Sequence, residues 1–264
     1  MQLSGAHVLI TGASKGIGVA MADAFTSAGA TCTLVARSAD ALAAHAARLG
    51  GHAVVADLST AAGVDGLVAK VEAEAGRPVD VLVSNAAIET SGHVDEISEA
   101  DIEAMVHTNL TAPMRLYRQV LPGMLERGRG HLVAISSLAG VFPVPGTSIY
   151  AGTKAGLTHY SNIAWGDLKG TPIGVTTVEP GPVKTDMWDR FVEHPTVGRA
   201  VKRLGKMQLV PQEPPEKIAS DVVRAVQRDR RHLRYPKRLY SAFLLESAPR
   251  RLTEALLVGQ KPSR

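Results

Sequence analysis

Short runs of apolar, β-branched residues alternate along the chain with longer segments rich in alanine and leucine. Each run is nearly continuous in apolar residues, which is typical of a strand whose two faces are both covered by other parts of the protein. The predicted strands are residues 7–10, 31–35, 53–56, 79–83, 131–135 and 173–178, with a shorter seventh at 232–235. The predicted helices are residues 17–27, 39–49, 61–74, 99–127 and 148–168.

This alternation predicts an α/β fold of the Rossmann-like, doubly wound type: a mostly parallel, seven-stranded sheet with helices on both faces. The 264 residues suit one large nucleotide-binding domain and leave little room for a second core. Two segments depart from the alternation. Residues 185–215 mix apolar and charged side chains and predict a substrate-binding insertion. Residues 238–264 predict an amphipathic helical tail.

Composition narrows the class of protein. Hydrophobic residues at 45% and charged residues at 20% argue against a disordered chain. The single cysteine excludes an internal disulfide. No apolar stretch approaches the ~18 residues that a membrane span needs. The start of the sequence lacks the charged and apolar pattern of a leader, so we expect a cytoplasmic protein. No metal site is expected.

The net charge of +4 raises the question of nucleic-acid binding. Basic residues are spread along the chain without interleaved aromatics, so we expect no nucleic-acid partner. One local excess runs through residues 224–238. It reads either as a solvated helix end and surface strand, or as a patch for an anionic substrate tail or a membrane surface. Membrane contact is the less favoured of these readings, and the tail more readily packs on the domain or on a partner subunit.

A glycine-rich turn follows the first predicted strand and opens the first helix, and its residues include Gly12, Ser14, Lys15, Gly16, Ile17 and Gly18. Dinucleotide sites need glycines for the tight turn, for close approach of the pyrophosphate and for helix–strand packing. The helix N-terminus adds amide donors and a favourable dipole for phosphate. A glycine turn alone is weak evidence, but the strand before it and the repeated strand–helix series favour dinucleotide binding.

The end of the second predicted strand indicates which dinucleotide binds. NAD sites usually carry a carboxylate there for the ribose 2′-hydroxyl, whereas this chain places Arg37 at that point. A guanidinium suits a 2′-phosphate, and Lys15 in the glycine turn could reach the same group. Either cation alone is commonly a solvated surface charge; together they predict NADP. Asp57 suits the adenine amino group, or equally a helix N-cap.

Tyr150 and Lys154 are four residues apart and share one face of a predicted helix. A free tyrosine has a pKa near 10, and a nearby ammonium group favours its phenolate and lowers that pKa. This spacing is common by chance. Its setting gives it weight, because Ser136 and Ser137 end the fifth strand, where active sites of open parallel sheets lie. Asn109 lies within the long preceding helix.

These motifs resemble the short-chain dehydrogenase/reductase family, in its single-domain branch with TGxxxGxG and YxxxK. The resemblance covers residues 4–185, with weaker agreement to about residue 236. The elements recur in family order: residues 11–18, Asp57-Leu58, Asn85-Ala86, Asn109, residues 135–137, Tyr150 with Lys154, and residues 180–185. Several independent motifs in order make the resemblance specific.

The resemblance implies catalytic roles by position. Tyr150 would be the general acid in reduction and the base in oxidation. Lys154 would tune Tyr150 and bond the nicotinamide ribose. Ser137, thirteen residues before Tyr150 (150 − 137) as is usual in the family, would orient the substrate carbonyl. Asn109 would hold a water in a proton relay with Lys154.

The resemblance also implies a cofactor site. Asn85 and Ala86 would line the adenosine-ribose side, and Val183 and Thr185 would position the nicotinamide carboxamide. The expected cofactor-binding residues are Gly12, Ser14, Lys15, Gly16, Ile17, Gly18, Arg37, Asp57, Leu58, Asn85, Ala86, Tyr150, Lys154, Pro180, Gly181, Val183 and Thr185.

The sequence departs from the family at one motif, where Ser84-Asn85-Ala86-Ala87 replaces the usual Asn-Asn-Ala-Gly. We expect Ser84 to bond backbone and activity to survive the extra methyl of Ala87. The trans-enoyl reductases of the superfamily use a wider Tyr–Lys spacing, so reduction of a carbon–carbon double bond is less favoured.

The predicted function is NADP(H)-dependent hydride transfer at a carbonyl or secondary alcohol. The alternative is a silent NADPH-binding sensor or scaffold; such relatives usually lose Tyr, Lys or Ser, which this chain keeps. Isomerase or dehydratase chemistry on the same fold is a third reading. Family resemblance implies a homodimer or homotetramer that pairs residues 99–127 and 148–168 across two-fold axes.

The substrate is predicted to be an apolar ketone or alcohol, of steroid-like, terpenoid or fatty-chain character. Apolar residues beyond Ser137 and at the start of the insertion would wall its pocket. Equally, they would pack into the core or a subunit interface. These residues are Val141, Phe142, Val144, Pro145, Met187, Trp188 and Phe191.

Overall fold

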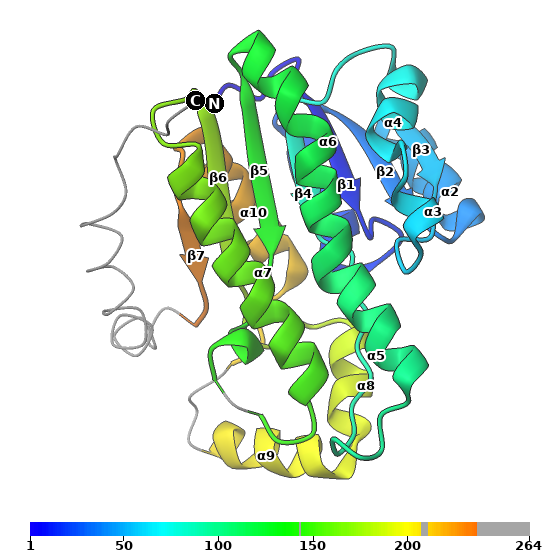
Figure 1. Ribbon diagram of the computed structural model, residues 1–264, viewed down its shortest axis with the longest axis vertical. Coiled ribbons are helices and arrows are strands. Elements are labelled where there is room, and N and C mark those ends of the chain that lie inside the picture. The colour runs from blue at the N-terminus through cyan, green and yellow to red at the C-terminus, as the bar shows by residue number, and fades with distance from the viewer. Residues whose placement is uncertain (143, 207–210, 237–264) are drawn as a thin grey trace.

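The computed structural model describes residues 1–142, 144–206 and 211–236. Its centre is a seven-stranded, parallel sheet in the order β3-β2-β1-β4-β5-β6-β7 (Figure 1), which confirms the predicted fold class. The strands are β1 (His7–Thr11), β2 (Thr31–Ala36), β3 (His52–Val55), β4 (Val81–Ser84), β5 (Gly130–Ile135), β6 (Ile173–Glu179) and β7 (His232–Arg234).

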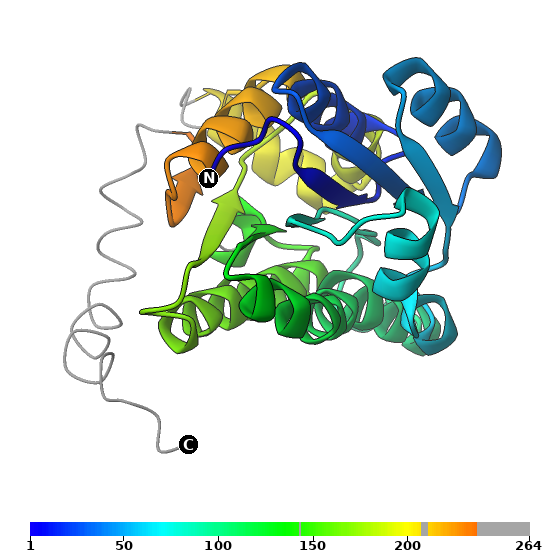
Figure 2. The same cartoon turned by 90° about the horizontal axis from the view of Figure 1, so that it is seen from above.

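Helices cover both faces of the sheet, as Figure 2 shows from above. One face carries α1 (Gly16–Ser27), α2 (Ala39–Leu49) and α10 (Pro215–Gln227). The opposite face carries α4 (Leu67–Ala75), α6 (Ala112–Arg127) and α7 (Ser148–Asp167). The shorter elements are α3 (Ala61–Val64), α5 (Glu99–Val106), the π-helical turn η1 (His107–Thr111), the 3-10 turn η2 (Leu138–Gly140), α8 (Asp186–Glu193) and α9 (Pro195–Lys206).

Alternation of side chains along β1 divides the buried apolar residues between the two faces. Val8 and Ile10 belong to the core beneath α1, α2 and α10, whereas Leu9 belongs to the core beneath α4, α6 and α7. Successive strand residues point to opposite sides, so both faces are apolar and the strand reads as a continuous hydrophobic run. This is why the apolar runs predicted the strands.

The strand order reverses at β1, which lies between β2 and β4. The chain moves outward through β2 and β3, then returns to the other side of β1 and continues through β4 to β7. In open parallel sheets a crevice forms at such a switch point, beyond the carboxyl ends of the strands. The fold therefore places the glycine turn after β1 and the segment after β4 beside one another.

The helices differ from prediction in detail. The predicted helix 61–74 is two helices, because Gly66 with a φ of 62° separates α3 from α4. The predicted helix 99–127 contains η1, which adds a wider turn around Asn109. The helix α10 was not among the predicted helices. The insertion forms α8 and α9 within the described residues, and the predicted tail at 238–264 lies outside them. No helix in the described ranges has the length and apolar character to cross a membrane.

Candidate active site

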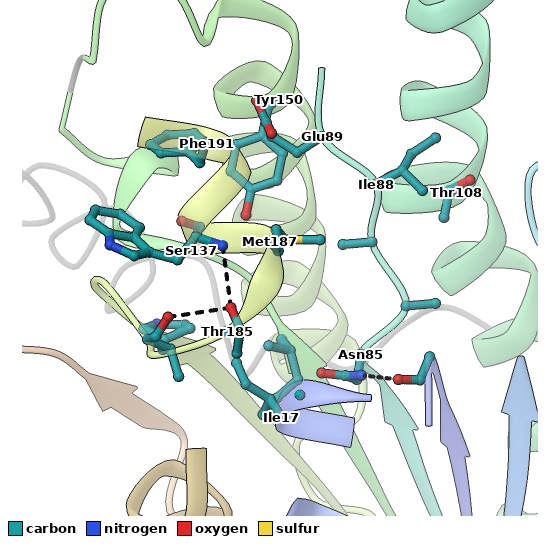
Figure 3. Close-up of a pocket in the computed structure, with 18 of the residues that line it drawn as sticks. Ile17, Asn85, Ile88, Glu89, Thr108, Ser137, Tyr150, Thr185, Met187 and Phe191 are labelled. Atoms are coloured by element: carbon teal, nitrogen blue, oxygen red, sulfur yellow. Dashed lines mark hydrogen bonds between the residues drawn. The ribbon is translucent and has the colours of Figure 1, made fainter. Parts of the chain in front are cut away.

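A cavity of about 910 Å³ opens at the carboxyl ends of the strands, at the switch point. Its volume lies in the range of small-molecule and cofactor sites. Figure 3 shows side chains from the segments after β1, β4, β5 and β6 and from α7 and α8 pointing into it. Of the predicted site residues, all line the cavity except Gly18 and Asn109, which lie in the layer behind it.

The glycine turn after β1 is packed too tightly for side chains. A Cβ on Gly12 would lie 2.7 Å from Ala86 Cα, and Gly12 has a φ of 67° that favours glycine. A Cβ on Gly18 would lie 2.2 Å from the Gly12 carbonyl oxygen. Asn85 Nδ2 donates hydrogen bonds to the carbonyls of Thr11 and Gly12, at 2.9 and 3.1 Å. The turn is thus fixed in place and carries no side chain at Gly12 or Gly18. Its backbone leads into the start of α1, where the helix dipole favours a phosphate group.

Charged residues from several segments line the cavity beside this turn. Arg37 is exposed and lines the cavity after β2. Lys15 is also exposed, and its Nζ lies 3.8 Å from Asp186 at the start of α8. Asp57 accepts hydrogen bonds from the Ser59 amide and hydroxyl, which, with the nearby Arg37 charge, hold its pKa below the usual range. The cationic donors Arg37 and Lys15 are of the kind that binds the phosphates of a dinucleotide, including a 2′-phosphate.

Tyr150 and Lys154 lie one turn apart on α7 and face the cavity, with Lys154 Nζ 5.8 Å from the Tyr150 ring centroid. Lys154 is buried, and its Nζ donates to the Ile135 carbonyl at 2.8 Å. Burial lowers the pKa of Lys154 to about 7. Burial raises the pKa of Tyr150 to about 12, although the nearby Ser137 hydroxyl acts in the opposite direction. The expected lowering of the tyrosine pKa by Lys154 is not seen in this structure, because burial of the phenol and the Glu89 charge both raise that pKa.

The two serines after β5 have separate surroundings. Ser137 lies close enough to Tyr150 to influence the pKa of the phenol, and its Oγ accepts from the Ala139 amide at 3.1 Å. Ser136 is buried, donates to the Lys154 carbonyl at 2.8 Å and shares a 2.7 Å hydrogen bond with Thr158. Ser137 is thus the serine beside the phenol, whereas Ser136 ties β5 to α7.

Asn109 is fully buried in η1, and its side chain is occupied by protein groups. Its Oδ1 accepts from the Ile88 amide at 2.9 Å. Its Nδ2 donates to the Ile88 carbonyl at 2.9 Å and to Thr153 Oγ1 at 3.1 Å. The side chain therefore clamps the segment after β4 against α7, and the relay water stays a prediction.

Comparison with known proteins agrees with this geometry. The sequence profile of the family described as short chain dehydrogenase matches residues 6–196. The chain belongs to the short-chain dehydrogenase family. It is 36% identical over 230 residues to the ketoacyl reductase HetN of Nostoc sp., covering 85% of this chain and 76% of that protein.

Two solved structures share the fold over almost the whole chain. A short-chain dehydrogenase from Sphingobium yanoikuyae, in complex with NADPH, has a TM-score of 0.80 and 28% identity, covering 98% of both chains. One from Burkholderia phymatum, in complex with NAD, has a TM-score of 0.81 and 23% identity, covering 96% of both chains. The second likeness concerns the fold alone. The two complexes show that this architecture accommodates either dinucleotide.

The loop after β6, which the sequence predicts to position the nicotinamide, also borders the cavity. Pro180, Gly181, Val183 and Thr185 line the cavity. Thr185 Oγ1 donates to the Val183 carbonyl and accepts from the Trp188 amide, each at 3.3 Å, so that it caps α8. The loop and the helix over the cavity are thus joined at one residue.

Apolar and aromatic residues wall the part of the cavity near Tyr150, but this wall differs from prediction. Phe142, Val144, Met187, Trp188 and Phe191 line it, whereas Val141 and Pro145 do not, because the chain turns Pro145 out to solvent. The Phe191 ring lies 6.2 Å from the Tyr150 ring and stacks on Trp188 at 5.6 Å. The helix α8 therefore closes an apolar compartment over the phenol.

Sequence reasoning missed several cavity residues and misjudged Ser84. Ile88, Glu89, Thr108, Leu138 and Val201 line the cavity. The sequence offered one signal, since Ile88 and Glu89 directly follow the Asn85-Ala86 motif. The expected backbone bond from Ser84 is not seen, because its buried hydroxyl has no partner among the described residues.

Proposed function

We propose that this short-chain dehydrogenase is an NADP(H)-dependent oxidoreductase that transfers a hydride between the nicotinamide and a carbonyl or secondary alcohol of an apolar substrate. The observation that carries the proposal is that Ser137, Tyr150 and buried Lys154 line one largely apolar cavity, with Lys154 one turn from Tyr150 on α7 and its Nζ 5.8 Å from the Tyr150 ring centroid. When bound, the cofactor supplies the hydride, and the protein supplies placement and a proton.

Tyr150 would donate the proton in carbonyl reduction. With its pKa raised to about 12 by burial, the phenol is protonated at neutral pH, which is the form that a general acid needs. Ser137 would hold the same substrate oxygen by a second hydrogen bond. Lys154 would place its Nζ near the phenol and the cofactor ribose. The aromatic wall formed by Trp188 and Phe191 would exclude water from the reacting carbon.

The choice of NADP rests on Arg37, with Lys15 in support. A carboxylate for the ribose 2′-hydroxyl is absent at the end of β2, and Arg37 lines the cavity there. The NADPH complex of the Sphingobium relative supports this choice, and the NAD complex of the more distant protein is why it needs a test.

The activity is tested by following NADPH absorbance with a panel of ketones, in which wild type is compared with Tyr150→Phe. Loss of the phenol hydroxyl should reduce kcat by roughly 10²–10⁴-fold while NADPH binding persists. Equal rates in the two proteins would refute the assignment. NADPH binding without turnover of any ketone by wild type would favour the silent sensor or scaffold instead.

The cofactor assignment has its own test in Arg37→Ala. We expect weaker NADPH binding and a shift of preference toward NADH, because the 2′-phosphate loses its bidentate partner. Lys70→Ala, a change on the outer surface of α4, is the matched loss of charge. Unchanged NADPH affinity and unchanged NADP/NAD preference in Arg37→Ala would overturn the assignment. A homo-oligomer remains a prediction from the family.

A further inference from the structure

Glu89 is a carboxylate in the apolar cavity that the proposed chemistry does not use. It lines the cavity on the segment after β4 and lies next to Tyr150 in Figure 3. The two hydrogen bonds of 2.9 Å between Asn109 and the Ile88 backbone fix the chain one residue before it. Glu89 is therefore held in place by a buried clamp.

The surroundings of Glu89 leave its charge only partly compensated. The Ser91 hydroxyl donates to one carboxylate oxygen, and the Arg190 and His194 charges act on it from α8 and its C-terminus. Arg190 is exposed, so solvent screens it. Desolvation is the largest influence and raises the pKa of Glu89 despite these partners. Arg190 and His194 therefore do not offset the rise in the Glu89 pKa that burial causes.

The Glu89 charge acts where a substrate would bind. Glu89 and Tyr150 line the same cavity and lie side by side in Figure 3, and the Glu89 charge is among the influences that raise the pKa of the phenol. A carboxylate accepts hydrogen bonds but donates none when ionised. A second carboxylate placed in the same poorly solvated cavity is repelled strongly, because the interaction grows as the local dielectric constant falls.

We propose that Glu89 determines substrate specificity: it rejects oxo acids, in which a free carboxylate lies next to the reacting carbonyl, and admits neutral carbonyl compounds such as their esters. This inference rests on the proposed function for the meaning of the reacting carbonyl. The discrimination itself is a property of the cavity, so it can be measured by binding as well as by turnover.

The test compares benzoylformate with ethyl benzoylformate, which share the aryl ketone and differ in the charge beside it. Dissociation constants are measured by calorimetry for the protein loaded with NADP, and kcat/KM is measured with NADPH. The variant is Glu89→Gln, which keeps size and polarity and removes the charge. The control is Glu96→Gln, which removes an exposed charge near His194 outside the cavity lining.

In wild type the ester should bind more tightly than the acid. In Glu89→Gln the acid-to-ester ratio of dissociation constants should fall by at least about tenfold, as expected when a like charge leaves a poorly solvated site. Glu96→Gln should keep the wild-type ratio. An unchanged ratio in Glu89→Gln would overturn the proposal, as would failure of both compounds to bind wild type. If the ratio falls but the ester is never reduced, the proposed function fails while the role of Glu89 stands.

Discussion

Replacing Asn109 with alanine tests the clamp between η1 and the segment after β4. Asn109 is fully buried, and the substitution deprives the Ile88 amide and the Ile88 carbonyl of their partner. It also removes a hydrogen bond to Thr153, which keeps its own bond to the Tyr150 carbonyl at 2.7 Å. The loss therefore falls mainly on two backbone groups.

The expected cost follows from these contacts. A buried backbone group left without a partner costs about 1–3 kcal/mol. Ile88 borders the cavity, so water can reach it in part and the lower half of that range applies. Two such groups give a loss of about 2–4 kcal/mol in the free energy of unfolding. The variant should also widen the spread of Glu89 positions, and so reduce discrimination between esters and acids.

The assay is urea unfolding followed by tryptophan fluorescence, with Thr108→Val as the matched control. Thr108 is the buried neighbour of Asn109, and its hydroxyl has no hydrogen-bond partner among the described residues. Removing that hydroxyl should therefore be neutral or stabilising. The reasoning is refuted if Asn109→Ala costs less than about 1 kcal/mol, or no more than Thr108→Val does.

Three further outcomes are expected. Gly18→Ala should lose about 1–3 kcal/mol of stability and weaken cofactor binding, because the new Cβ would lie 2.2 Å from the Gly12 carbonyl oxygen. Gly152→Ala is the control and should be tolerated, because a Cβ there has no atom within 4 Å. Ser137→Ala should lower kcat by roughly 10²-fold, whereas Ser136→Ala should mainly lower stability, since its hydroxyl bonds Lys154 and Thr158; equal kcat losses would contradict this. Burial lowers the pKa of Lys154 from 10.5 to about 7, so between these values the unfolded chain binds a proton that the folded chain has lost. Stability should rise with pH through that window more steeply in wild type than in Lys154→Met, as denaturation at stepped pH would show.

The sheet was predictable because each strand is apolar on both faces. Val8 and Ile10 pack in one core and Leu9 packs in the other, so every one of these consecutive positions has to be apolar. The glycine turn was predictable for a similar reason, since Gly12 and Gly18 admit no side chain. Burial on both faces and local steric limits restrict which residue types a position accepts, and a single sequence is enough to reveal such restrictions.

Other features depend on contacts between distant segments, so the local sequence pattern gives only a weak indication of them. The π-helical turn at Asn109 keeps a helical pattern of apolar residues, so periodicity does not reveal it. The break at Gly66 was hidden because apolar residues continue on both sides. From the sequence alone Glu89 looks like an ordinary surface acid. Its place in the cavity depends on the fold, which brings α8 to the same cavity. The raised pKa of Tyr150 depends on burial, which the spacing to Lys154 does not encode.

Deuterium transfer tests the central claim most directly. NADPH labelled at the transferred position of the nicotinamide ring is incubated with the protein and ethyl benzoylformate, and the alcohol is analysed by mass spectrometry. The account predicts one deuterium on the carbinol carbon with wild type, and formation of that alcohol slowed by roughly 10²-fold or more in Tyr150→Phe. Unlabelled alcohol, or equal formation by both proteins, would contradict hydride transfer assisted by Tyr150.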